Sequence, residues 1–400
     1  MKKFATSTKK ILLSFVVWRI VLFLVAFLAI YFIPKWGGWF PYADRALEPT
    51  GLPSWIWGFG NFDGVHYLKI MQDGYKNVFS QAFFPLFPLL GRALTSINVL
   101  IPKSTTLDLN IMVDPAYFYN SFILANGLFV LALYYLYRLF RLDYSEKTSY
   151  LSLLLLLVFP TSFYFGAIYT ESLFLLLTVL CLYTLRKKNY LVAGVFAAFA
   201  SATRVLGLAL FVVLVVELLS NLKTKKFILK SKDFIKSSVG VLIAPLGTLV
   251  YMAYLKATTG DWLYFLTAQP SFGAERSATP FILLPQVIYR YIKMFLIIPV
   301  GSLQYLTLIN EFLMTLIPLT LLIIFIKKIR LSYLFFMLIC LVVPTLTGTF
   351  SSMPRYALMS FLLFPLIVEK TGKYYKLLVF LFLILGIILV SLFTRGYWIS

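Results

Sequence analysis

The chain has 400 residues, of which 61% are hydrophobic and only 13% are charged, whereas a soluble domain carries about 25% charged residues. Several apolar runs reach the roughly 17–25 residues that a membrane-spanning helix needs, which excludes a soluble globular domain and predicts an all-α polytopic membrane protein. The net charge of +21 does not indicate a nucleic-acid partner, because the basic residues gather in short polar breaks between apolar runs, as expected for cytoplasmic loops that face anionic membrane lipids.

The first apolar run, at residues 11–33, follows a basic start and predicts a retained helix that runs from the inside to the outside. Residues 34–81 are then expected to form the first extracytoplasmic loop. This segment is rich in Trp, Gly and Pro, a composition typical of the membrane–water interface, and it predicts short interfacial helices that lie along the bilayer.

The remaining apolar runs predict further spans, although residues 82–101, with two prolines among aromatics, fit either a re-entrant or an interfacial helix. A second large extracytoplasmic segment is expected at residues 256–304. The later spans are predicted at residues 116–139, 150–165, 172–185, 190–203, 205–219, 234–255, 305–326, 331–350, 356–368 and 377–394. Together with the first helix they make about eleven transmembrane helices in one integral-membrane domain covering residues 1–400, with the amino terminus inside and the carboxyl terminus outside.

The acidic residues are unevenly distributed over this predicted topology. Ten of the 15 fall on the outer side, namely Asp44, Glu48, Asp63, Asp73, Asp108, Asp114, Glu171, Asp261, Glu275 and Glu311. Arg204 and Arg355 also fall at outer helix ends, against the positive-inside bias. Because an ionisable group near lipid costs roughly 2.5–3.5 kcal/mol at a helix centre, such groups are expected to face a polar cavity or a partner. The outer face is therefore predicted to carry the function.

The stretch NFDGVHY at residues 61–67 contains Asp63 and His66, the only histidine. If residues 62–75 form a short helix, these two side chains lie three positions apart on one face, and Tyr67 adjoins them. A carboxylate so placed is suited to act as a general base, and an imidazole is suited to hold a substrate or an anion. The alternative is a solvated loop in which Asp63 caps a helix.

Three other stretches place polar side chains at the predicted outer boundary. In FPTSFYFGAIYTESL, at residues 159–173, Glu171 either caps the next helix or binds substrate. Arg204 in SATRVLG and Arg355 in SSMPRYAL either bind a phosphate, which the planar guanidinium suits, or extend to the membrane interface.

Several kinds of chemistry have no signature in the sequence. There is no Walker A loop, no G-x-G-x-x-G fingerprint and no Asp-x-Asp pair. One histidine, with Cys181 and Cys340 in apolar runs, does not make a zinc site or a disulfide framework. No cofactor and no metal are therefore expected, and an outward-facing enzyme would use an activated substrate carried by a lipid.

The sequence NFDGVHYLKIMQDGY, at residues 61–75, resembles the W-D-x-x-H-Y-L-x-I-A-x-x-G-Y segment of the PIG-V-type mannosyltransferases, with Phe62 in place of the usual Trp. The resemblance continues in order through AFFPLFPLL, FPTSFYFGAIYTESLFLL, SATRVLGL and MPRYAL, and so covers most of the chain. The first and third of these stretches are the most specific.

This resemblance implies the GT-C superfamily of glycosyltransferases and a polyprenyl- or dolichyl-phosphate-linked sugar donor, usually mannose. It also implies an inverting reaction with Asp63 as the catalytic residue. In that reading Arg204, Arg355 or His66 would stabilise charge on the departing phosphate, and Tyr67 and Glu171 would shape the pocket. The acceptor would be a glycolipid, a glycan or a protein.

Two other functions remain open at this point. A transporter or flippase would share the composition, although transporters place their binding groups near the membrane midplane. A degenerate relative would act as a structural subunit, and some PIG-V enzymes work with a small membrane partner. Because no ER-retention signal is present, the expected location is a prokaryotic cytoplasmic membrane, with the active site on the extracytoplasmic face.

Overall fold

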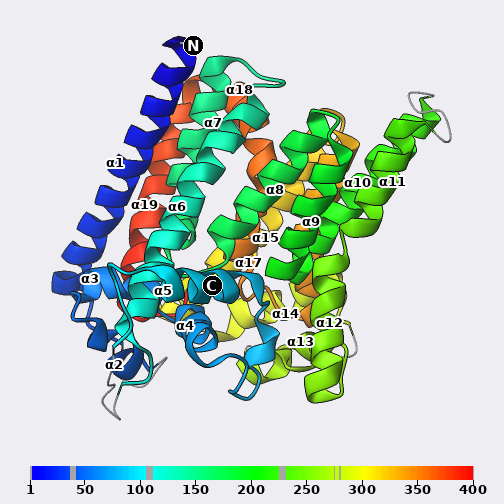
Figure 1. The fold of residues 1–400 in the computed structure, drawn as a ribbon. Coiled ribbons are helices and arrows are strands. Elements are labelled where there is room, and N and C mark those ends of the chain that lie inside the picture. Colours follow the sequence, from blue (N-terminus) through cyan, green and yellow to red (C-terminus); the bar gives the residue numbers. More distant parts are fainter. Residues whose placement is uncertain are drawn as a thin grey trace. The chain divides into compact units, whose positions relative to one another are not determined.

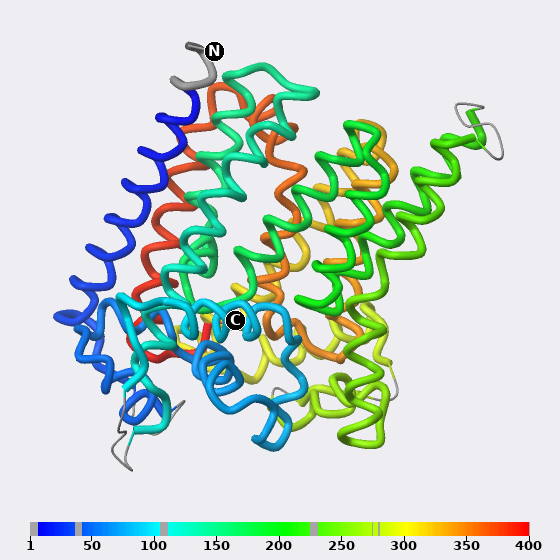
Figure 2. Tube along the Cα trace, in the orientation of Figure 1, coloured from blue at the N-terminus to red at the C-terminus, as the bar shows by residue number. Residues whose placement is uncertain are grey.

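The structure is a computed structural model that describes residues 2–36, 42–104, 111–224, 231–273, 275–278 and 281–399, with side chains from residue 7 onward. Asp108 lies outside the described residues. Helices and loops, without a strand, make up the part of the chain that is described (Figures 1 and 2). The chain divides into two compact units, one of Met1–Val179 with Ile367–Ile399 and one of Leu180–Leu366.

Long apolar helices make up the body of the first unit. They are α1 (Lys2–Phe32), α6 (Pro115–Phe140), α7 (Glu146–Val158) and α19 (Tyr375–Thr394). The helix α1 contacts the other three (Figure 1). Asp114 caps α6 by accepting a hydrogen bond from the amide of Ala116, and Ser145 caps α7 by accepting one from the amide of Thr148. These caps use amide groups that the first turn of a helix cannot pair internally.

The predicted span at residues 150–165 is shorter than expected. The helix α7 ends at Val158, because Pro160 forces the preceding Phe159 into an extended conformation with ψ of 136°. The chain then forms a 3₁₀ turn, η4 (Ser162–Gly166). The proline visible in the sequence thus ends the helix and leaves the segment that follows free to pack elsewhere in the first unit.

The first predicted outer loop is a series of short helices, as expected. They are α2 (Ala43–Ala46), η1 (Glu48–Thr50), α3 (Ser54–Trp57), η2 (Gly58–Gly60), α4 (Asp63–Asp73) and η3 (Ser80–Ala82). The unassigned segment contains α5 (Leu86–Ile97), which packs on α4 and α6. Arg92 of α5 donates a hydrogen bond to the carbonyl of Gln72 at 2.8 Å, so α5 satisfies the carboxyl end of α4.

Two helices carry the chain from one unit to the other, α8 (Glu171–Arg186) and α18 (Phe364–Thr371). The second unit begins with α9 (Tyr190–Thr203), η5 (Val205–Gly207), α10 (Leu208–Lys223), α11 (Lys232–Ile243) and α12 (Leu246–Thr259). The predicted span at residues 234–255 is therefore divided at Pro245. Close packing of α9 on α11 requires glycine, because a Cβ at Gly194 would lie 2.4 Å from the carbonyl oxygen of Gly240.

The rest of the second unit surrounds a polar loop at residues 348–352. Its elements are α13 (Tyr264–Thr267), η6 (Gln269–Phe272), α14 (Leu284–Ile297), α15 (Leu303–Phe325), α16 (Leu331–Val342), η7 (Val343–Thr347), α17 (Met353–Tyr356) and η8 (Ala357–Leu363). A short turn, η9 (Gly372–Tyr374), precedes α19 in the first unit.

Six helical segments in the described residues are long and apolar enough to cross a membrane. They are Ser7–Phe32, Pro115–Phe140, Val205–Lys223, Lys232–Thr259, Leu303–Phe325 and Met353–Thr394. Shorter apolar helices occur at Leu86–Ile97, Tyr190–Thr203 and Leu331–Thr347. The prediction of an all-α polytopic membrane protein is confirmed, and the number of eleven spans stays a prediction. Cys181 and Cys340 are buried and unbonded, as expected.

Candidate functional site

Asp63 is the first residue of α4, the short helix predicted from NFDGVHY, and Gly74 ends that helix with a positive φ of 75°. Asp63, His66 and Lys69 follow one another at three-residue intervals and are half-buried, whereas the opposite side of the helix is packed in the unit. The N-cap position is occupied by Phe62 and not by Asp63. Asp63 is therefore not the helix cap that the alternative interpretation required.

Phe62 adopts an unusual backbone conformation directly before Asp63. Its φ and ψ are 59° and −118°, a combination that costs a bulky residue roughly 1–3 kcal/mol and that is often found at functional sites. Its ring is held by Phe393 and Trp398, with centroids 5.6 and 5.1 Å away. The aromatic ring, which in the family is usually that of Trp, thus fixes the direction in which the chain enters α4.

The backbone on the other side of Phe62 is fixed by hydrogen bonds to distant segments. Asn61 is 1% exposed and donates from its side-chain amide to the carbonyl of Phe393 at 2.9 Å. Tyr169 donates from its hydroxyl to the carbonyl of Asn61 at 2.9 Å, and the amide of Ile168 donates to the carbonyl of Phe59 at 3.0 Å. The stretch at residues 159–173 therefore positions Asp63, a role that its sequence did not indicate.

Arg19 of α1 supports the same segment and was not foreseen. Its guanidinium lies 4.3 Å from the ring centroid of Phe59, and a similar distance from those of Phe23 and Phe122. It also donates a hydrogen bond to the carbonyl of Gly166 at 3.1 Å. A Cβ at Gly166 would lie 2.4 Å from Arg19 Nη1, so glycine is needed for this approach. The cation–π contacts explain how a buried arginine is accommodated in an apolar helix.

His66 and Tyr67 belong to an aromatic cluster that includes part of AFFPLFPLL. The imidazole of His66 stacks on Phe83 with centroids 5.0 Å apart, and Tyr67 is in edge contact with Phe83, Phe87 and Tyr169. Burial lowers the pKa of His66 below its usual 6.5, an effect that Asp63 opposes and Lys69 reinforces. The neutral imidazole is thus favoured, which suits a hydrogen-bonding role better than the cationic role expected for it.

Glu171 is the first residue of α8 and is fully buried. A carboxylate is favourable at the amino end of a helix, and the interpretation of Glu171 as a helix cap stays a prediction. Its neighbours Thr170 and Ser172 are also buried, and their hydroxyl oxygens have no hydrogen-bond partner among the described residues. Because buried polar groups are normally satisfied, this position also remains a candidate for contact with a ligand.

In the second unit the two predicted arginines lie at one place in the fold. Arg204 ends α9 and is half-buried, with its guanidinium 5.0 Å from the ring centroid of Tyr356. Arg355 precedes Tyr356 in α17, is 7% exposed, and donates a hydrogen bond to Ser352 Oγ at 3.2 Å. Both guanidinium groups contact side chains of the second unit.

Two further arginines, which sequence reasoning missed, bind the same loop. Arg276 donates to Ser351 Oγ at 3.3 Å and to Ser352 Oγ at 3.2 Å. Arg290 donates to the carbonyl of Gly348 at 3.2 Å. We call Arg276, Arg290 and Arg355, with the loop of residues 348–352, the arginine loop. Guanidinium groups bind phosphate oxygens with paired hydrogen bonds, so this loop is chemically suited to an anion.

Tyr291 contacts the arginine loop through its hydroxyl, at Thr349 and Phe350. Its hydroxyl donates a hydrogen bond to Glu311 and accepts one from the amide of Phe350 at 3.0 Å. Burial, followed by the nearby Glu311, raises the pKa of Tyr291, so its hydroxyl stays protonated and continues to donate. In the described part of the chain no group of three or more His, Cys, Asp or Glu residues is arranged to hold a metal ion.

Comparisons with known proteins complete the description. No curated protein matches the sequence. Among solved structures, the chain is similar to the oligosaccharyltransferase of Archaeoglobus fulgidus in a crystal structure of the apo form, with 12% identity and a TM-score of 0.46 over 96% of this chain. The chain spans about half of that protein, 56% of its length.

The family model of the mannosyltransferases (PIG-V) matches residues 8–395. This match covers nearly the whole sequence and every stretch discussed above, so the chain belongs to the mannosyltransferase (PIG-V) family of membrane glycosyltransferases.

Proposed function

We propose that the protein moves a mannosyl group from a polyprenyl-phosphate donor to a hydroxyl of a glycolipid, glycan or protein acceptor, with inversion at the anomeric carbon. The observation that carries this proposal is the position of Asp63. Its carboxylate stands at the start of α4, after a strained residue and a buried asparagine that fix the backbone. Strain of this kind is kept where function needs a fixed geometry.

In the proposed reaction, Asp63 accepts the proton of the acceptor hydroxyl as its oxygen attacks C1 of the sugar. The new C1–oxygen bond forms while the bond between C1 and the phosphate oxygen breaks, and the phosphate leaves with the electron pair. A phosphate is a good leaving group, so one base is sufficient, unlike the carboxylate pair of an inverting glycosidase. No metal and no nucleotide take part in this scheme.

We assign the phosphate of the donor to arginines of the second unit, as the resemblance of SATRVLGL and MPRYAL to the family implies for Arg204 and Arg355. Arg276 and Arg355 both bind Ser352, and their guanidinium groups would stabilise the charge that grows on the departing phosphate. Arg204, whose guanidinium lies over the ring of Tyr356, would contribute as well. His66, as a neutral imidazole, would hydrogen-bond a sugar or acceptor hydroxyl, and Tyr67 and Glu171 would shape the pocket around it.

We place this reaction on the extracytoplasmic face of a prokaryotic cytoplasmic membrane, with the amino terminus inside. The support is the distribution of charge along the chain, because the basic breaks follow the positive-inside rule. Membership of a mannosyltransferase family does not favour the transporter. A small membrane partner remains compatible with the proposal.

The donor class is tested by incubating the purified protein in lipid vesicles with polyprenyl-phosphate-mannose or with GDP-mannose, together with a panel of acceptors. We expect acceptor-dependent release of polyprenyl phosphate, unaffected by EDTA, and no reaction with the nucleotide sugar. Nuclear magnetic resonance of the product should show the anomer opposite to that of the donor. Transfer from GDP-mannose, or retention of the anomer, would refute the proposal.

A further inference from the structure

The first unit contains a pocket of about 360 Å³, lined by polar and charged residues, at the end where α1 and α7 begin. Its lining residues are Ser7, Lys10, Tyr137, Glu146, Lys147 and Tyr150. The two lysines are exposed at its mouth, and Tyr137 is buried at 5% exposure. The amino end of α7, a helix of 13 residues, adds the partial positive charge of its unpaired amide groups. Two cations against the one carboxylate of Glu146 make the pocket suited to an anion.

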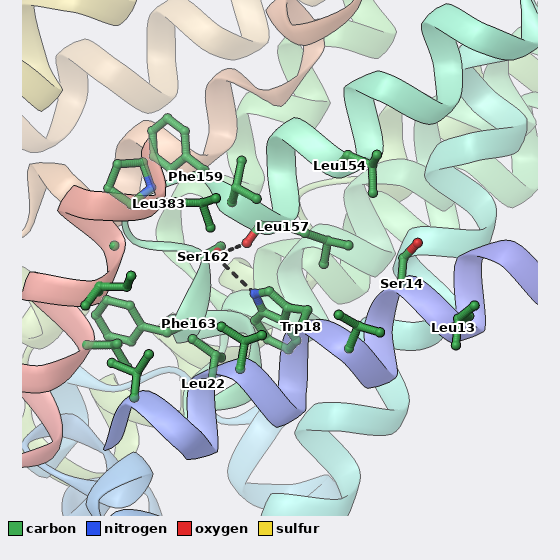
Figure 3. A pocket seen from close by; sticks show the side chains of 18 of the residues that line it. Leu13, Ser14, Trp18, Leu22, Leu154, Leu157, Phe159, Ser162, Phe163 and Leu383 are labelled. Carbon is green, nitrogen blue, oxygen red and sulfur yellow. Dashed lines mark hydrogen bonds between the residues drawn. The ribbon is translucent and has the colours of Figure 1, made fainter. Parts of the chain in front are cut away.

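An apolar groove of about 390 Å³ lies between α1, α7 and α19 in the same unit (Figure 3). Val17, Val21, Leu154, Leu383 and Ile387 are among its lining residues. The polar groups of its wall are mostly paired with one another, since Trp18 donates to Ser162 Oγ and Ser162 donates to the carbonyl of Leu157 (Figure 3). The groove therefore offers a hydrocarbon surface and few polar partners.

The pocket and the groove adjoin each other at Tyr150, which lines both. Its hydroxyl lies 2.8 Å from Ser14 Oγ, and this pair marks the boundary between the polar and the apolar part. On α1, Lys10, Ser14 and Val17 follow one another at three- or four-residue spacing, so they share one face of the helix. The site as a whole is thus amphipathic, with a cationic end and an apolar end.

The length of the groove matches one leaflet of a bilayer. Its residues on α1 run from Leu13 to Val25, which corresponds to about 18 Å at 1.5 Å per residue. Half of the hydrocarbon core is about 15 Å. An acyl chain lying in this groove would therefore keep its headgroup at Lys10, at the level of the membrane surface.

We propose that this site binds an anionic phospholipid, with the phosphate against Lys10 and Lys147 and one acyl chain in the groove. Basic pockets between transmembrane helices recognise anionic headgroups in this way. Lys10 lies near the start of α1. The segment before Asp63 is hydrogen-bonded instead to Phe393, near the end of α19 in the same unit. The proposed lipid is therefore a different ligand from the sugar donor. The lipid would join α1, α7 and α19.

The headgroup contact is tested by native mass spectrometry of the purified full-length protein, titrated with phosphatidylglycerol or with phosphatidylcholine of the same chain length. We expect phosphatidylglycerol to bind about tenfold more tightly, and Lys10→Ala and Lys147→Ala each to weaken it about fivefold. Lys9→Ala is the matched control, because Lys9 is exposed on the same helix and does not line the pocket. Equal binding of the two lipids, or equal effects of Lys9→Ala and Lys10→Ala, would overturn the proposal.

The chain contact is tested by Val17→Trp, which places a large ring in the groove, with Val16→Trp as its control at a similarly exposed position outside it. Only Val17→Trp should weaken the binding of phosphatidylglycerol, by about tenfold or more. Glycerol phosphate, which has no acyl chains, should bind at least 100-fold more weakly than the lipid. If both tryptophan variants bind as the unmodified protein does, the groove is not the chain site. Asp63→Asn should bind the lipid normally, so this test is independent of the proposed transferase reaction.

Discussion

The segment before α4 in the first unit and the arginine loop in the second unit hold their side chains in different ways. In the first, the side chains of Asn61 and Tyr169 donate hydrogen bonds to main-chain carbonyls, and the ring of Phe62 packs against another ring. The second is fixed by side-chain hydrogen bonds from Arg276 and Arg355 to serine hydroxyls. The former arrangement allows the backbone before Asp63 little freedom, as the proposed base requires. The latter supplies positive charge, and in the proposed reaction its guanidinium groups would exchange a serine partner for a phosphate oxygen.

The comparison predicts that removing Arg355 affects the chemical step strongly. Arg355→Ala should lower kcat about 10²–10³-fold, the typical cost of losing one donor to a developing negative charge. Arg355→Lys should recover only a small part, because an ammonium lacks the planar pair of donors. Turnover measured with polyprenyl-phosphate-mannose checks this, with Arg330→Ala, at the N-cap of α16, as the control. Full recovery by lysine would instead support an arginine that merely extends to the interface.

Loss of the buried hydrogen bond before Asp63 should have the next largest effect. Asn61→Ala should lower kcat about 10–100-fold, because the proposed base is misplaced, and should change KM for the donor little. It should also lower the free energy of unfolding by about 1–3 kcal/mol. Asn120→Ala is the matched control, because Asn120 is also fully buried in the first unit and hydrogen-bonded to Ala116 and Asn98. Equal loss of kcat in both variants would mean that Asn61 acts only on stability.

Arg276 should act on binding more than on turnover. Arg276→Ala should raise KM for the donor about tenfold. A charge-assisted hydrogen bond contributes about 1.5–3 kcal/mol, and the effect falls at the lower end of this range because Arg276 is only half-buried. Kinetics over a range of donor concentrations separate KM from kcat. An unchanged KM would remove Arg276 from the phosphate site and leave it as a support for Ser351 and Ser352.

The smallest expected effect concerns the pH dependence of stability. Burial keeps the pKa of His66 below 6.5 in the folded chain, so the unfolded chain binds this proton first as the pH falls. The contribution of His66 to stability is therefore present above pH 6.5 and is lost as the pH falls through the folded pKa. His66→Gln should show a smaller decrease of the unfolding midpoint between about pH 7.5 and about pH 5 than the unmodified protein. An identical decrease would show that the pKa of His66 does not differ between the folded and the unfolded chain.

Local features of this fold were predictable from the sequence. The start of α4 at Asp63 and its end at Gly74, and the turn at Arg204, follow from residue spacing and from the conformational freedom of glycine. Pro160 and Pro245 could also have been recognised as helix boundaries. The predicted span at residues 150–165 was too long because an apolar composition continues across Pro160, whereas the span at residues 234–255 falls within the candidate span Lys232–Thr259 and is interrupted at Pro245.

The contacts that fix the candidate site were not predictable in the same way. Tyr169 binds Asn61 across 108 positions, and Arg276 binds Ser352 across 76. Hydropathy and periodicity describe which side of a helix is apolar, and they contain no information about which distant carbonyl a hydroxyl or guanidinium will reach. A single sequence proposes the carboxylate, whereas the groups that hold the segment before it depend on the tertiary structure.

The most direct test of the account is mannosyl transfer by Asp63→Asn, measured beside Asp73→Asn, which changes the last residue of the same helix. With purified protein in lipid vesicles, polyprenyl-phosphate-mannose and a competent acceptor, we expect Asp63→Asn to lose about 10²–10⁴-fold in kcat while it still binds the donor. Asp73→Asn should keep nearly full activity. Full turnover by Asp63→Asn would contradict the assignment of the base, and with it the interpretation of the strained segment that precedes α4.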